Sequence, residues 1–252
     1  MILQTSNCLR LKHQYYAGIG KSQDNKTRSA NAVNDFIELY PSVAYKDYDL
    51  FTAEDSPQYL RDVLKRSFDL VVSSIALIIG SPFFALLVVI TKITSDGNVF
   101  FRQQRIGKNG IPFYIYKFRS MCIDAENSGP QLAQDNDPRI TAWGRIMRKK
   151  RLDELPQFLN VFLGHMSVVG PRPERRFFIE KIIEKAPEYK NLLSIKPGIT
   201  SIGQVRYGYA ENVEQMIERM KLDLLYLNRQ TVTVDIGIIL ETVRVMIQGK
   251  GK

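Results

Sequence analysis

Cysteine and histidine are scarce in this 252-residue chain, which contains two of each. Cys8 and Cys122 are too few for the disulfide framework of a small secreted domain, and they lack the paired spacing of a zinc site. The chain also has no Walker-type glycine loop and no dinucleotide-binding glycine fingerprint, so ATP hydrolysis and hydride transfer have no support. This cysteine content is compatible with a reducing, cytoplasmic environment.

The composition is that of a globular protein, with 44% hydrophobic and 24% charged residues. The formal net charge of +9 indicates an anionic partner. Three classes of partner fit that charge: nucleic acid, an acidic membrane surface and phosphorylated substrates.

Residues 70–90 form an uncharged run of 21 residues, which as a helix would extend roughly 30 Å, enough to cross a bilayer. Ser81 and Pro82 lie at its centre, where proline removes a backbone hydrogen bond and bends the helix. Basic residues flank both ends, which favours keeping both ends on the cytoplasmic side: Arg61, Lys65 and Arg66 before the run, and Lys92, Arg102, Arg105 and Lys108 after it. The sequence therefore predicts a re-entrant helix that breaks at Ser81 and Pro82. A proline-kinked full crossing and a buried core helix are the alternatives.

Two β-rich segments, residues 99–104 and 111–118, are joined by a glycine-containing turn at 107–110 and predict a β-hairpin. Alternation along the second strand places Phe113, Ile115, Lys117 and Arg119 on one side. Two apolar residues followed by two cations indicate a strand that leaves the core and enters a polar site. A solvated strand end is the alternative.

The most informative stretch is a cation cluster, at residues 145–151, that runs into the adjacent carboxylates Asp153 and Glu154. Its candidate phosphate-binding residues include Arg145 and Arg148, which would share a helix face. The apolar residues that follow recur with helical spacing and predict an amphipathic helix docked on the core: Leu155, Phe158, Leu159 and Phe162. Asp153 as a simple helix cap is the alternative to a catalytic or metal-binding carboxylate beside a phosphate site.

A second candidate phosphate ligand is Arg172, between Pro171 and Pro173. Both prolines fix φ, so the guanidinium would project from a stiff segment and bind phosphate with little ordering cost. The alternative is a rigid surface turn.

The last helix is expected to begin near Asp235, as its cap, and to carry an apolar face of Ile236, Ile239, Leu240, Val243 and Ile247. Such a face either packs on the domain or lies in the membrane interface. Few cations occupy the opposite face, so the sequence favours packing on the domain.

Several motifs resemble, in order, those of the bacterial sugar transferase family, the monotopic polyprenyl-phosphate phosphoglycosyltransferases. They are Lys117-Phe-Arg-Ser-Met121, Asp153-Glu-Leu-Pro-Gln157, the run 164–173 that ends in Pro-Arg-Pro, and Lys196-Pro-Gly-Ile-Thr200. The resemblance covers about residues 63–252. It departs from the family pattern at Ser201, where glycine is usual, and at His165, where aspartate is usual. His165 is expected at the surface.

The resemblance implies a mixed α/β monotopic membrane protein at the cytoplasmic face of the bacterial inner membrane. We expect an N-terminal extension (1–60), a membrane-embedded re-entrant helix (61–95) and a cytosolic transferase domain (96–252). The implied reaction moves a sugar-1-phosphate from a UDP-sugar to polyprenyl phosphate and releases UMP. The sugar and any homo-oligomer are left open.

The resemblance assigns roles to the candidate residues. Asp153 is the expected nucleophile that carries the phosphosugar, and Asp153 and Glu154 are both candidate ligands of Mg²⁺. The expected substrate-binding cations are Lys117, Arg119, Arg145, Arg148 and Arg172.

A competing hypothesis is a non-catalytic basic protein on the membrane surface that binds nucleic acid or anionic lipid. Nucleic acid is the weaker partner, because no aromatic stacking platform, helix-turn-helix pattern or RNA-recognition signature accompanies the cations.

Overall fold

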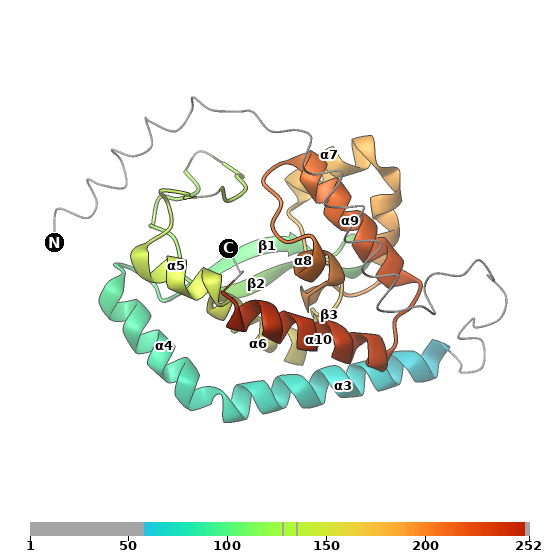
Figure 1. Cartoon of the computed structure of the whole chain (residues 1–252), viewed down its shortest axis with the longest axis horizontal. Coiled ribbons are helices and arrows are strands. Elements are labelled where there is room, and N and C mark those ends of the chain that lie inside the picture. The colour runs from blue at the N-terminus through green and yellow to red at the C-terminus, as the bar shows by residue number, and fades with distance from the viewer. Residues whose placement is uncertain (1–57, 128, 135, 250–252) are drawn as a thin grey trace.

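The computed structural model describes residues 58–127, 129–134 and 136–249, and the predicted extension at residues 1–60 lies almost entirely outside them. The described chain is a mixed α/β structure, as predicted. It begins with two consecutive helices, α3 (Gln58–Ile79) and α4 (Ser81–Thr94), which form a wide V along one side of the remaining elements (Figure 1).

The break between α3 and α4 falls at the predicted residues. Pro82 has no N–H to give to the carbonyl of Ile78, four residues earlier. The Ser81 hydroxyl donates to that carbonyl instead, at 2.8 Å, so the broken turn keeps a partner. Gly80 has no room for a Cβ beside the carbonyl of Ala76 and the ring of Phe84.

No unbroken helix among the described residues combines the length and apolar composition needed to cross a bilayer. The pair Tyr59–Ile79 and Ser81–Thr94, bent by 60°, meets that requirement only when both helices are taken together.

The predicted hairpin is confirmed. Strand β1 (Phe100–Ile106) pairs antiparallel with β2 (Pro112–Phe118), from Phe100 opposite Phe118 to Ile106 opposite Pro112. A short 3-10 turn, η4 (Lys108–Gly110), connects them. Phe113 and Ile115 are buried on the predicted side of β2, and Phe118 is buried at its end.

A second, very short sheet joins two segments far apart in sequence. β3 (Ser167–Val169) runs parallel to β4 (Gly198–Thr200). Gly170 and Gly198 face each other where the two segments meet, and a Cβ on either would overlap the other's backbone. These glycines are therefore required for the close approach that positions the Pro-Arg-Pro segment.

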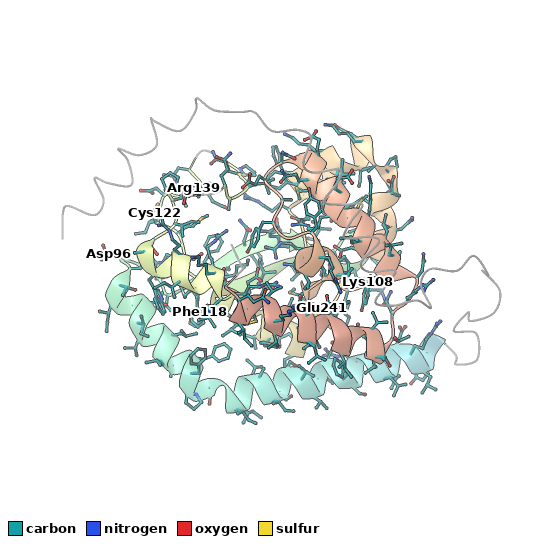
Figure 2. All side chains as sticks on the ribbon, in the orientation of Figure 1. Asp96, Lys108, Phe118, Cys122, Arg139 and Glu241 are labelled. Atoms are coloured by element: carbon teal, nitrogen blue, oxygen red, sulfur yellow. The ribbon has the colours of Figure 1, made fainter. Side chains whose placement is uncertain are left out.

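The remaining helices surround the two sheets: α5 (Ala142–Lys149), η5 (Leu152–Glu154), α6 (Gln157–Phe162), α7 (Arg176–Lys185), η6 (Pro187–Ser194), α8 (Ile202–Arg206), α9 (Val213–Leu227) and α10 (Val232–Ile247). Side chains fill the spaces between them (Figure 2). One core cluster packs α7, η6 and α9 together, and a smaller one, built on Leu87, Phe118 and Met147, joins α4 to β2 and α5.

The prediction that the apolar stripe after Glu154 docks on the core is half confirmed, because Leu155 and Phe158 are partly buried against core clusters. Helix α6 buries Gln157, Asn160 and Val161, whereas Leu159 and Phe162 are exposed. Asn160 is held because its side chain donates to the carbonyl of Tyr114 on β2, at 2.7 Å, and accepts from the amide of Tyr116.

The expectation for the last helix is also wrong in two respects. Thr231, not Asp235, caps α10, by accepting from the amide of Val234. Asp235 is fully buried, where it forms an ion pair with Lys65 of α3 and accepts a hydrogen bond of 2.6 Å from the Tyr226 hydroxyl. The predicted apolar face does not pack on the domain, since four of its residues are exposed: Ile236, Leu240, Val243 and Ile247.

The departures from the family pattern cause no backbone strain. Ser201 has an extended conformation, φ −142°, and its side chain caps α8 by accepting from the amide of Gln204. His165 is exposed, as expected.

Candidate active site

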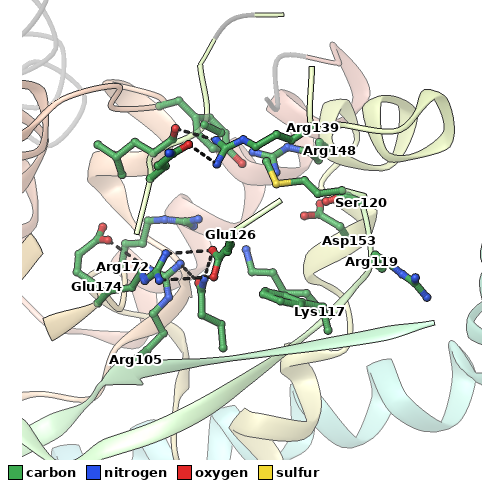
Figure 3. Close-up of a pocket in the computed structure, with 18 of the residues that line it drawn as sticks. Arg105, Lys117, Arg119, Ser120, Glu126, Arg139, Arg148, Asp153, Arg172 and Glu174 are labelled. Carbon is green, nitrogen blue, oxygen red and sulfur yellow. Dashed lines mark hydrogen bonds and ion pairs between the residues drawn. The ribbon is translucent and has the colours of Figure 1, made fainter. Parts of the chain in front are cut away.

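A cavity of about 200 Å³ opens where β1, β2, the start of α7, α9 and the segment around Asp153 converge (Figure 3). Eight cationic side chains line it: Arg105, Lys117, Arg119, Arg139, Arg148, Arg172, Arg175 and Arg219. Of the carboxylates that the structure describes, three do so: Asp153, Glu126 and Glu174. This excess of positive charge suits a phosphorylated ligand.

The backbone turns at Arg151, just before the adjacent carboxylates Asp153 and Glu154. Arg151 has left-handed backbone torsions, φ 53° and ψ 23°, which non-glycine residues seldom adopt. Its side chain compensates, because the guanidinium donates to Glu154 Oε2 through Nε (3.0 Å) and Nη2 (2.7 Å) and also reaches the carbonyl of Ile199 (3.0 Å). The turn ends α5, so that Asp153 and Glu154 lie in the short helix η5 rather than at the start of a longer helix.

Glu154 is enclosed by cations on both of its oxygens. Oε2 pairs with Arg151, while Oε1 accepts from Lys117 at 2.9 Å and from Arg172 at 3.1 Å. Burial alone would raise the pKa of this carboxyl, but the three cations hold it well below its ordinary value. Glu154 is therefore an ionised residue that holds basic side chains in place.

Asp153 has different surroundings. The side chain is 3% exposed and lines the cavity, and the structure shows no hydrogen bond or ion pair from any described residue to its carboxylate. Burial raises the pKa of Asp153, and the neighbouring charge of Glu154 adds to this, although Lys117 and Arg148 act in the opposite direction. Asp153 is thus an acid whose oxygens are not already bound to cations.

Arg172 reaches the site from the rigid segment that the sequence predicted. The carbonyl of Pro171 accepts from the amide of Gly198 at 2.9 Å, and the amide of Gly170 donates to the carbonyl of Thr200 at 3.0 Å. The guanidinium also lies over the ring of Tyr209, 5.9 Å from its centroid. The Glu154 carboxylate keeps the pKa of Arg172 above its ordinary value despite burial, so this cation is permanent.

The other predicted cations do not all reach the cavity. Lys117 and Arg148 line it, and burial lowers the pKa of Lys117 even though Glu154 favours its charged form. Arg119 lines it too, but its guanidinium projects to the side opposite Arg172 (Figure 3). Arg145, one turn before Arg148 on α5, is exposed and does not line the cavity.

Sequence reasoning missed a second layer of ion pairs. Glu174 pairs with Arg219 (2.5 Å) and Arg105 (3.3 Å), and Glu126 pairs with Arg175 (3.0 Å). Arg219 lies on α9 and Arg105 on β1, so only the tertiary fold brings them to Glu174. Glu174 and Arg175 directly follow the Pro-Arg-Pro motif. This closeness in sequence was the one local signal that they belong to the site.

The side chains at the cavity can be compared with the ligands that the expected magnesium site needs. The described residues contain no group of three metal-ligating side chains. Glu154 already binds cations through both oxygens, and among the described residues that line the cavity only Asp153 offers a carboxylate without an ion pair. Mg²⁺ is commonly held by one or two carboxylates together with substrate phosphates. The site therefore fits an ion that arrives on a diphosphate, and does not fit one held by protein alone.

Comparison with known proteins decides the family. The family model described as bacterial sugar transferase matches residues 60–249, about three quarters of the chain.

The chain belongs to the bacterial sugar transferase family.

Two of the relatives to which the chain is similar are named as transferases. A UDP-N-acetylgalactosamine-undecaprenyl-phosphate N-acetylgalactosaminephosphotransferase of Aeromonas hydrophila is 39% identical over 195 residues, 77% of this chain and 46% of the relative. A UDP-glucose:undecaprenyl-phosphate glucose-1-phosphate transferase of Klebsiella pneumoniae is 40% identical over 192 residues, 75% of this chain and 41% of the relative. The chain thus spans less than half the length of these two bacterial sugar transferases. It spans 98% of a shorter relative, the exopolysaccharide production protein PSS of Rhizobium leguminosarum bv. phaseoli, at 40% identity over 199 residues.

Proposed function

We propose that this bacterial sugar transferase moves a sugar-1-phosphate from a UDP-sugar to polyprenyl phosphate in two steps, through a phosphosugar bound to Asp153. The reaction would begin the assembly of a glycan. The observation that carries the proposal is the contrast at the cavity wall, where Asp153 pairs with no cation among the described residues while Glu154, next to it, has three such partners.

In the first step, an oxygen of Asp153 attacks the sugar-proximal phosphorus of the UDP-sugar. The bond between that phosphorus and the bridging oxygen breaks, UMP leaves with the electron pair, and an aspartyl phosphosugar remains. Arg148 and Arg172 line the same cavity and would stabilise the charge that develops on the phosphoryl oxygens. Nucleophilic attack needs the ionised carboxylate, which the nearby cations favour.

In the second step, a phosphate oxygen of the polyprenyl phosphate attacks the same phosphorus. The bond to Asp153 breaks, the carboxylate is restored, and a polyprenyl-diphosphate sugar forms. Two separate steps suit two substrates of opposite solubility, because the soluble donor and the lipid acceptor need not be bound together.

Magnesium is proposed as the metal of the first step, bound to the diphosphate. Asp153 is the side chain that would contact it, and Glu154 would join only if the diphosphate drew Lys117 or Arg172 away. When bound, the ion would neutralise charge on the leaving group. The protein's own contribution is the array of fixed guanidinium groups.

A membrane location is supported by the exposed apolar side chains along the bent helix pair. They include Val71, Ile75, Ile78 and Ile79 on α3, and Phe83, Leu86, Val89 and Ile93 on α4. Contiguous exposure of large aliphatic residues in a soluble protein would be unfavourable, whereas lipid covers them at no cost. We propose that α3 and α4 enter the inner membrane from the cytoplasmic face and form the predicted re-entrant element.

The competing hypothesis of a non-catalytic basic protein gains no support. The cations converge on a cavity that contains Asp153, a carboxylate with no ion pair to any described residue, whereas a surface that binds nucleic acid or anionic lipid would present its cations outwards.

The proposal is tested by UMP release from a panel of UDP-sugars, with undecaprenyl phosphate in detergent or nanodiscs. The names of the relatives contain both glucose and N-acetylgalactosamine, so both nucleotide sugars belong in the panel. We expect at least one UDP-sugar to release UMP in proportion to the lipid product formed. If no UDP-sugar in a broad panel does so, the proposed function is wrong.

A further inference from the structure

Arg119 is a buried cation that the first step does not use. It directly follows β2 and is 8% exposed. Its Nη1 donates to the carbonyl of Asp96, but Nε and Nη2 are buried and have no hydrogen-bond partner among the described residues. Leaving two guanidinium nitrogens buried and unpaired is unfavourable, and a bound anion would supply the missing acceptors.

The position of Arg119 is fixed by the end of the bent helix pair. Its amide donates to the carbonyl of Val99 at 2.9 Å, and the guanidinium lies against the loop formed by Asp96 and Gly97, just after α4. Gly97 has φ +96°, and a Cβ there would overlap the guanidinium. Glycine at this position therefore permits the contact.

Helix α4 is itself held against the catalytic elements. Thr91 accepts a hydrogen bond of 3.1 Å from the indole of Trp143 on α5, and Leu87 packs with Phe118, next to Arg119. A lipid that followed α4 out of the bilayer would meet Arg119 at the point where the helix joins the hairpin.

Arg119, Arg172 and Asp153 line the same cavity. Lys117 and Arg172 both contact Glu154. The guanidinium of Arg119 projects away from Arg172 and Glu174 (Figure 3). Asp153, the proposed nucleophile, lies between Arg172 and Arg119 in this view (Figure 3).

We propose that Arg119 binds the phosphate of the lipid acceptor, while the group around Lys117 and Arg172 binds the diphosphate of the nucleotide sugar. This assignment rests on the proposed two-step function. Arg119 holds the acceptor phosphate while one of its oxygens attacks the phosphosugar and Asp153 leaves as a carboxylate. The charge of the guanidinium does not change during the step.

The experiment separates the two half-reactions. The UMP formed in a single turnover without acceptor measures the first half-reaction, the transfer to Asp153. The steady-state KM for undecaprenyl phosphate measures acceptor binding in the second half-reaction. The variants are Arg119→Gln, Arg119→Lys and a matched control, Arg102→Gln. Arg102 belongs to the same hairpin but is exposed and stacks on Tyr114, 5.3 Å from the ring centroid.

We expect Arg119→Gln to release one equivalent of UMP per enzyme as the wild type does, with an unchanged KM for the UDP-sugar. Its KM for undecaprenyl phosphate should rise by about 10- to 100-fold, the effect of losing a charge-assisted hydrogen bond. The KM of Arg119→Lys for undecaprenyl phosphate should lie between those of the wild type and Arg119→Gln. The KM of Arg102→Gln should match that of the wild type.

The assignment would be overturned if Arg119→Gln lost the UMP burst while Arg119→Lys remained active in both steps and kept the wild-type KM for undecaprenyl phosphate. So would an unchanged acceptor KM in Arg119→Gln. If Arg119→Gln does not fold, the acceptor KM of Arg119→Lys decides, and a value equal to that of the wild type refutes the proposal. Failure of the proposed function looks different, because then the wild type itself gives no UMP burst.

Discussion

Lys117 Nζ lies 2.9 Å from Glu154 Oε1, and this ion pair distinguishes two carboxylates that are adjacent in the chain. Glu154 binds Lys117, Arg151 and Arg172, whereas Asp153 remains without a partner among the described residues. The two acids therefore have different chemistry. Glu154 organises the cations, and Asp153 is the residue available to react.

Substitution of Glu154 by glutamine should destabilise the fold. The change leaves three buried cations without their shared anion, and breaking a buried ion pair in this way costs roughly 3–5 kcal/mol. We expect a lower melting temperature in detergent at neutral pH. As a control, Glu184→Gln changes an exposed glutamate on α7 and should leave the melting temperature within error of the wild type.

The same variant has a characteristic pH dependence. The pKa of Glu154 is lowered in the folded state, so its ionised form stabilises the fold above the unfolded pKa, and the effect is lost as pH falls through the lowered value. The difference in melting temperature between wild type and Glu154→Gln should therefore be full at neutral pH and shrink in strong acid. A difference that grows on acidification would contradict the assigned network.

Arg148 and Arg145 provide a matched pair on one helix, since only Arg148 lines the cavity. Arg148→Gln should slow single-turnover UMP release by roughly 100-fold, the typical effect of removing one group that stabilises transition-state charge. Arg145→Gln should leave the rate close to that of the wild type. Equal losses in the two variants would show that the exposed arginine also contributes.

The pH profile of the first step offers a second comparison of these variants. Burial raises the pKa of Asp153 and Arg148 opposes that increase, so removing Arg148 should raise the pKa further. Because the reacting species is the carboxylate, UMP release should fall on the acidic side at a higher pH in Arg148→Gln than in the wild type. Arg145→Gln should show no such displacement.

Pro82→Ala tests the cause of the helix break. Alanine restores an N–H that can donate to the carbonyl of Ile78, and it removes the clash of the proline ring. We expect the bent pair to straighten, so that a labelling site placed just before α3 becomes accessible from the opposite side of the membrane. Ser81→Ala, which removes only the compensating hydroxyl, should keep the wild-type accessibility, and an unmoved label in Pro82→Ala would mean that proline does not set the topology.

The hairpin, the helix break and the rigid Pro-Arg-Pro segment were all predictable, because each depends on residues close together in the chain. Alternation placed Phe113 and Ile115 in the core, and the missing amide of Pro82 favours a break in the middle of a long helix. Adjacent carboxylates after a cation cluster also indicated the site. Their different surroundings were not predictable, because Lys117 and Arg172 reach Glu154 from distant segments.

Hydrophobic periodicity misled in two places for one reason. The spacing of Leu159 and Phe162 on α6, and of Leu240 and Ile247 on α10, identifies an apolar side but does not say what covers it. These four residues are exposed, while the helices pack through Val161 and Ile238 and through polar residues such as Asn160 and Asp235, whose partners include residues far away in sequence. The left-handed turn at Arg151 likewise depends on contacts with β4 that no local pattern indicates.

The most direct test of the account is the mass of the protein after incubation with a UDP-sugar and Mg²⁺ without lipid acceptor. A rapidly quenched wild-type sample should gain the mass of one sugar phosphate, located on the peptide that contains Asp153, in an amount equal to the UMP released. Asp153→Asn should gain no such mass and release no UMP, and added undecaprenyl phosphate should remove the adduct from the wild type. Turnover by Asp153→Asn, or an adduct on another residue, would contradict the central role of Asp153.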